Sequence, residues 1–152
     1  MVSWWMLVLV VFGAPLLDSI VPVLPGEVVV AAAAATLIGG SLPVPAVIGV
    51  AAAGSLIGEC VVLSITRRLV GTPRGDRIVS GNKAARIRRF VGRWGLGAVV
   101  VARFLPGGRT ATAATFALRP GPVTGFVAAA GAGSLIWAGY LVAVGSGVAS
   151  LI

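Results

Sequence analysis

The side chains of this chain that could do chemistry are a few charged groups placed inside apolar segments. The sequence holds four acidic residues and no histidine. Asp18 and Glu27 flank a break rich in proline and glycine, and Arg103 and Arg109 flank a second break of the same kind. A charged side chain in the middle of a membrane segment costs about 3 kcal/mol or more. Charges kept at such positions therefore indicate a functional site.

The second break is followed by a sequence suited to binding an anion. Pro106-Gly107-Gly108 precedes Arg109-Thr110, where we expect a helix to begin. The first turn of a helix presents free N–H groups and the positive end of the helix dipole. Glycines let an anion approach the backbone, and arginine adds a planar charged fork that fits phosphate. We predict a site for a lipid phosphate built from Arg103, Gly107, Gly108, Arg109 and Thr110.

The carboxylates suit a different task. In a membrane, a carboxylate beside an arginine can form an ion pair or bind a proton, and this exchange would couple transport to the proton gradient. We assign this role to Glu27, Asp18 and Glu59. Two interpretations of the charged set stay open: a transport site, or static ion pairs that hold the helices together. Glu59 has a further alternative, because it could pair with the basic loop that follows it.

The residue inventory excludes several classes of chemistry. Without histidine, the chain lacks His-based acid–base catalysis, Ser-His-Asp triads and His-ligated metals. A single cysteine, Cys60, can form neither an intrachain disulfide nor a cysteine metal cluster. We expect no enzyme activity, no cofactor and no metal.

The composition predicts an all-α membrane protein. Of the 152 residues, 58% are hydrophobic and 11% are charged, whereas about a quarter of the residues of a soluble domain are charged. The mean hydropathy is +1.06. The whole net charge of +8 lies in residues 67–93, and such basic loops face the cytoplasm. Without aromatic platforms, nucleic-acid binding is not expected.

The elements that must position the charged groups follow from apolar runs and breaks. We predict one membrane domain over residues 1–152, in two halves. Residues 1–66 hold an apolar segment that is not a cleaved signal peptide (2–17), a re-entrant hairpin (18–40) and a membrane span (44–66). Residues 67–94 form the basic cytoplasmic loop, with an amphipathic helix at 83–94. Residues 95–152 hold a second re-entrant hairpin (95–119) and a second span (123–150).

An internal repeat supports two related halves. Pro25-Gly26 recurs as Pro106-Gly107, and Gly54-Ser-Leu-Ile57 recurs as Gly133-Ser-Leu-Ile136, at offsets of 81 and 79 residues. Each half is then one hairpin and one span. With a cytoplasmic basic loop, the two hairpins enter the membrane from opposite sides, so the halves form an inverted repeat. Transporters often have this architecture.

At these residues the sequence resembles the DedA family, also called the VTT or SNARE-associated domain family. The stretch Arg103-Phe-Leu-Pro-Gly-Gly-Arg109-Thr110 is similar to the family motif Arg-Phe-x-Pro-x-x-Arg-Thr. Residues 18–27 resemble its first hairpin, and Trp137 resembles a tryptophan of its last core span. The similarity extends from about Leu17 to about Gly145.

The resemblance implies an integral membrane protein with two re-entrant hairpins that moves lipids between leaflets. Bacterial members are implicated in the transfer of polyprenyl phosphate or phosphatidylethanolamine, and eukaryotic relatives in lipid scrambling. It also implies that Asp18, Glu27, Arg103 and Arg109 are essential for transport and linked to proton coupling.

We therefore expect a flippase of the bacterial inner membrane for a phosphate-bearing lipid, foremost undecaprenyl or decaprenyl phosphate, coupled to protons. The alternative is an energy-independent phospholipid scramblase or a phosphatidylethanolamine flippase. The expected partners are a lipid phosphate headgroup and the bilayer, with no nucleic acid, and a homo-oligomer is compatible with the sequence.

Overall fold

A computed structural model describes residues 3–21, 23, 25–38 and 42–149. Every regular element in these ranges is helical, which confirms the predicted all-α class. The helices in chain order are α1 (Trp4–Ile20), α2 (Gly26–Ile38), α3 (Val44–Leu69), α4 (Pro73–Val79), α5 (Asn82–Trp94), α6 (Gly97–Val101), the 3₁₀ turn η1 (Ala102–Phe104), α7 (Gly108–Ala117) and α8 (Thr124–Ala149).

The two long helices α3 and α8 form the axis of the molecule. Both are long and apolar enough to cross a membrane, with mean hydropathies of 2.1 and 1.7 over their most apolar stretches. They correspond to the spans predicted at 44–66 and 123–150. Helix α3 continues three residues further than predicted and includes Arg67 and Arg68, because basic side chains suit the last turn of a helix.

The first hairpin consists of α1 and α2. It therefore differs from the hairpin predicted at 18–40, because its first arm is the apolar segment that was expected at 2–17 as a separate element. Helix α1 runs on through Asp18 to Ile20. Helix α2 begins directly after Pro25, at Gly26. The end of the hairpin predicted at 18–40 and the end of the last span at 150 lie outside the described residues.

The second hairpin consists of α6, η1 and α7, and it turns at the predicted Pro-Gly-Gly break. Gly107 has a positive φ of 71°, which a residue without a side chain adopts at little cost. Gly108 opens α7, and a Cβ there would lie 1.9 Å from the carbonyl oxygen of Ala102. Both glycines are thus required by the backbone of the turn.

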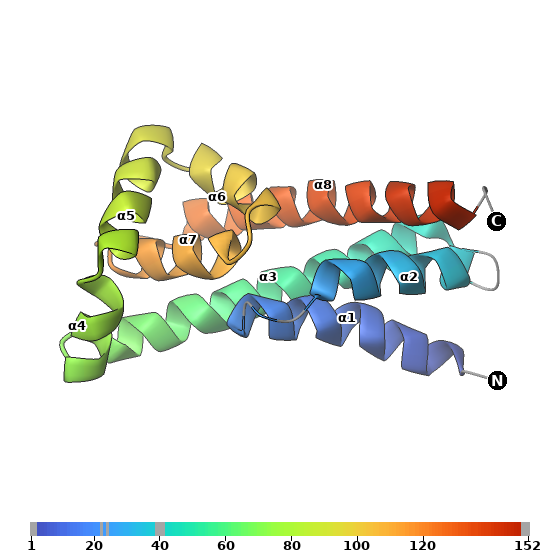
Figure 1. Cartoon of the computed structure of the whole chain (residues 1–152), viewed down its shortest axis with the longest axis horizontal. Helices are drawn as coiled ribbons and strands as arrows, with labels where there is room; N and C mark the ends of the chain where they lie inside the picture. Colours follow the sequence, from blue (N-terminus) through green and yellow to red (C-terminus); the bar gives the residue numbers. More distant parts are fainter. Residues whose placement is uncertain (1–2, 22, 24, 39–41, 150–152) are drawn as a thin grey trace.

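The two hairpins approach the middle of the molecule from opposite ends of its long axis (Figure 1). Each has its own apolar core against α3 and α8. One core joins α1 and α2 to the first half of α3 and the second half of α8, around Trp137. The other joins α6 and α7 to the second half of α3 and the first half of α8, around Phe126. How the hairpins lie in a bilayer stays a prediction, as does the inverted repeat.

The basic loop folds into two helices. The amphipathic helix predicted at 83–94 is α5, which begins one residue earlier. On its apolar face, Val91 is fully buried within the protein, whereas Trp94 is exposed. Helix α4 was not predicted, although Pro73 opens it and the Thr72 side chain accepts a hydrogen bond from the Gly75 N–H at 3.2 Å.

Helices α1 and α3 approach each other closely at a glycine. A Cβ on Gly54 would lie 2.1 Å from the carbonyl oxygen of Phe12 on α1, whereas a Cβ on Gly49 of the same helix would meet nothing within 4 Å. The packing of the first hairpin on α3 therefore depends on the absent side chain of Gly54.

We predict that Gly54→Ala destabilises the protein by about 2 kcal/mol, because α1 must move away from α3. Gly49→Ala is the matched control and should stabilise slightly, since alanine is favoured over glycine in a helix by about 0.5–1 kcal/mol. Thermal unfolding of both variants in one detergent measures the difference. Equal midpoints would show that the close approach does not limit packing.

Candidate functional site

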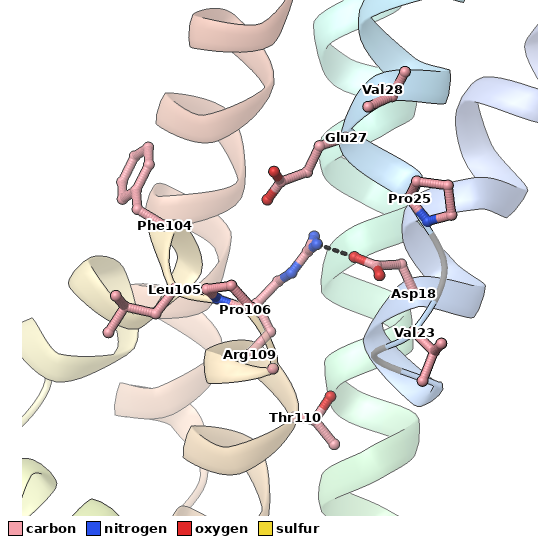
Figure 2. A pocket seen from close by; sticks show the side chains of 11 residues that line it. Asp18, Val23, Pro25, Glu27, Val28, Phe104, Leu105, Pro106, Arg109 and Thr110 are labelled. Carbon is pink, nitrogen blue, oxygen red and sulfur yellow. Dashed lines mark hydrogen bonds and ion pairs between the residues drawn. The ribbon is translucent and has the colours of Figure 1, made fainter.

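The breaks of the two hairpins line one cavity. It has a volume of about 270 Å³ and lies between the first turn of α2, the end of α1 and the turn before α7. The lining residues are Asp18, Val23, Pro25, Glu27, Val28, Phe104, Leu105, Pro106, Gly107, Arg109 and Thr110. Figure 2 shows the charged side chains converging on this space from both hairpins. Segments far apart in the sequence thus meet at the predicted breaks.

An ion pair between Arg109 and Asp18 joins the hairpins. The Arg109 Nη2 donates to Asp18 Oδ2, and the two side chains are 7% and 12% exposed. The carboxylate lies at the end of α1 and the guanidinium comes from the first turn of α7. A Cβ on Gly26 would lie 2.9 Å from the Asp18 Cβ, so the glycine of the first break makes room for this carboxylate.

A second link lies beside the ion pair. The Thr110 hydroxyl donates to the backbone carbonyl of Ser19 at 2.7 Å. Residues 18 and 19 of the first hairpin are therefore bonded to residues 109 and 110 of the second. These two adjacent links close the contact between hairpins at the wall of the cavity.

Glu27 lies on the opposite side of the cavity from the turn of the second hairpin. Its side chain is exposed and points into the space near the guanidinium of Arg109 (Figure 2). Within the described part of the chain it forms no ion pair. The cavity thus contains one cation, already paired, and one carboxylate without a counter-charge.

Arg103 was predicted to be part of the phosphate site, but the structure places it outside the cavity. It is 1% exposed, does not line the cavity, and forms an ion pair of 2.5 Å with Glu59, which is fully buried. A second bond of 3.0 Å joins Arg103 Nη1 to Glu59 Oε2. The structure therefore brings Glu59 into the charged set, as the partner of Arg103. Within the described residues, its hydrogen bonds and its ion pair are to Arg103 and Ser55 and not to the basic loop.

Ser55 connects the buried ion pair with the cavity. Its Oγ accepts bonds from Arg103 Nη2 at 2.8 Å and from Arg109 Nη1 at 3.3 Å, and it donates to Glu59 at 3.4 Å. Ser134 accepts a further bond from Arg103 Nη2 at 2.5 Å. Neither serine was predicted as a site residue. The signal was present, because they are the serines of the repeated Gly-Ser-Leu-Ile segments.

Arg109 forms a cation–π contact with the aromatic ring of Trp137. The guanidinium carbon lies 4.7 Å from the centre of the ring, and Trp137 is 1% exposed. A cation over a desolvated indole gains about 2 kcal/mol. Arg109 is thus held by a ring, a hydroxyl and a carboxylate, while part of its side chain remains at the cavity.

The glycines of the predicted site have different positions. Gly107 lines the cavity, but Gly108 does not, so its direct role in binding stays a prediction. Within the described ranges, no three acidic or cysteine side chains gather where they could hold a metal ion. The arrangement is suited instead to an anion that competes with Asp18 for Arg109.

Comparison with known proteins gives a family assignment. The model of the VTT domain matches residues 22–147, which includes both breaks from Pro25 onward and both long helices. No curated protein and no solved structure matches the chain.

We predict that Glu59→Gln destabilises the protein by about 3–5 kcal/mol, because it leaves Arg103 buried without a counter-charge. Replacing both partners, as in Arg103→Met with Glu59→Gln, should recover much of this loss. Asp76→Asn, at an exposed acid of α4, is the control and should change little. Thermal unfolding in detergent distinguishes them, and equal effects of the two single variants would contradict the assigned role.

Proposed function

The chain belongs to the VTT domain family, the family of DedA proteins, and on that premise we propose that it moves a phosphate-bearing lipid between membrane leaflets. The observation that supports this most directly is the Arg109–Asp18 pair at the wall of a cavity shared by both hairpins. The proposal is a transporter rather than an enzyme, in a bacterial inner membrane, with the basic loop facing the cytoplasm.

The phosphate step follows from the geometry of Arg109. Its guanidinium is a planar fork that binds phosphate through two N–H groups. In the resting protein one terminal nitrogen is paired with Asp18 and the other with Ser55. A phosphate that enters the cavity competes with these neighbours for the same donors, and the positive end of the α7 dipole favours an anion there.

Proton coupling follows from the charges around that phosphate. Asp18 and Glu27 line the same cavity, and two carboxylates beside a phosphate repel it. Binding is therefore favoured when the carboxylates take up protons. Release of the lipid on the other side lets Asp18 return to Arg109 as its proton leaves. This cycle moves protons with the lipid.

The buried pair has a supporting role in the cycle. Arg103 and Glu59 hold Ser55 from one side, and Ser55 holds Arg109 from the other. The guanidinium carbon of Arg109 also lies over the ring of Trp137. The arginine can thus change its anionic partner without leaving its position.

The size of the cavity favours a lipid with a small head. A volume of about 270 Å³ holds a bare phosphate with its water, and a polyprenyl phosphate carries no further head group. The uncompensated Glu27 supports a second candidate, phosphatidylethanolamine. Its phosphate would bind Arg109 and its ammonium would bind Glu27. An energy-independent scramblase would use the same cavity without the proton step.

We predict that Arg109→Lys lowers the transport of polyprenyl phosphate in proteoliposomes at least tenfold, because a lysine loses the two-pronged contact with phosphate. Arg77→Lys, at an exposed position of α4, is the control. Parallel assays with phosphatidylethanolamine and phosphatidylcholine identify the head group. Glu27→Gln should impair the transport of phosphatidylethanolamine but not that of phosphatidylcholine. Unchanged transport of every lipid by a folded Arg109→Lys variant would contradict the site.

We predict that the affinity for polyprenyl phosphate rises as the pH is lowered, because a protonated Asp18 no longer competes for Arg109 or repels the phosphate. Asp18→Asn should bind well at all pH values and show a weaker dependence. The wild type and the variant see the same phosphate, so its own titration cancels from the comparison. Equal pH profiles for the wild type and Asp18→Asn would exclude coupling through Asp18.

A further inference from the structure

A second cavity lies between the basic amphipathic helix α5 and the helix α7 that carries Arg109. Its volume is about 270 Å³. Half-buried apolar side chains form most of its lining, with Ala84 and Ile87 on α5 and Ala111, Ala114 and Leu118 on α7. The proposed transport mechanism makes no use of this space.

The cavity is a groove that follows one face of α7. The α7 side of the lining begins at Gly107 and ends at Leu118, with members three or four residues apart, as expected for one helical face. Eleven residues of helical rise make the groove about 16 Å long. Gly107 and Thr110 line both this groove and the cavity of Arg109. The groove and the charged cavity therefore share a wall at these two residues.

The rim of the groove is basic. Lys83 and Arg88 on α5 line it and are exposed. Helix α5 lies across the end of α7 (Figure 1), within the segment that carries the whole net charge of +8. An apolar trough with a cationic rim is complementary to an amphiphile with an anionic head and a hydrocarbon chain.

We propose that the groove between α5 and α7 binds an anionic lipid of the adjacent leaflet, with the phosphate at Lys83 and one hydrocarbon chain along Ala111 and Ala114. This orientation is the one a lipid has in a bilayer, with its head at the basic surface and its chain toward the middle. The site is distinct from the cavity of Arg109 and does not depend on the transport function proposed for it. The shared wall at Gly107 and Thr110 places the bound lipid next to the entrance of that cavity.

Photo-crosslinking tests the groove directly. The full-length protein is reconstituted into phosphatidylcholine vesicles that contain a small fraction of phosphatidic acid with a diazirine in its acyl chain. After irradiation, mass spectrometry maps the labelled residues. The expected result is labelling of α7 between residues 111 and 118 and of Ile87, at least fivefold above that given by a phosphatidylcholine probe of the same chain. Equal labelling by the two probes would overturn the anionic-lipid assignment.

Two pairs of variants separate the chain contact from the head contact. Ala114→Trp fills the groove and should lower labelling at least fivefold, whereas Ala128→Trp, at an exposed position of α8, should not. Lys83→Glu should lower labelling by phosphatidic acid alone, whereas Arg93→Glu, with the same charge change on α5 outside the groove, should not. Labelling that Ala114→Trp leaves unchanged would overturn the groove.

The failure of this proposal is distinguishable from that of the transport proposal. Arg109→Ala should abolish lipid transport and leave the labelling of the groove at the wild-type level, since Arg109 does not line it. If the groove variants change neither labelling nor its preference for the anionic probe, the groove proposal fails whatever the transport assay shows.

Discussion

Two buried guanidinium groups impose the constraint that the rest of this structure satisfies. A charge in an apolar interior is stable only if paired and hydrogen-bonded. Arg103 obtains its partners from α3 and α8, and Arg109 obtains a carboxylate from α1 and a ring from α8. Helices α1, α3 and α8 therefore each have to approach the second hairpin at the level of these two arginines. The glycines at the close contacts permit that approach.

The fold was largely predictable where it depends on local sequence properties. The apolar run that predicts a span at 44–66 and the periodicity that predicts a helix at 83–94 agree with α3 and α5 within a few residues. The first hairpin was predicted to begin at residue 18, where the apolar run ends, whereas α1 is its first arm and continues to Ile20. Asp18 remains helical since α1 packs along α3, and Ser19 bonds back to the carbonyl of Pro15 at 2.8 Å. Such tertiary support is invisible in an apolar pattern.

The site was predictable as a set of residues but not as a set of pairs. The breaks and their charges indicated a meeting of two hairpins, and the structure brings Asp18 to Arg109. Which carboxylate meets which arginine depends on the direction of each side chain around its helix. Arg103 turns away from the cavity to Glu59, because η1 directs it between α3 and α8. A serine in an apolar segment carries no charge that would mark it as a site residue. The role of Ser55 and Ser134 is seen only from their shared hydrogen-bond donor, Arg103.

The division of charge between the hairpins has a consequence for biosynthesis. Both cavity carboxylates belong to the first hairpin, and their counterpart Arg109 is separated from Asp18 by 91 positions along the chain. When the first hairpin leaves the ribosome, Arg109 has not yet been synthesised, so the ion pair with Asp18 cannot form. The hydrogen bond from Thr110 to Ser19 is absent at that stage for the same reason. The contact between the two hairpins is therefore completed only after most of the chain has been made.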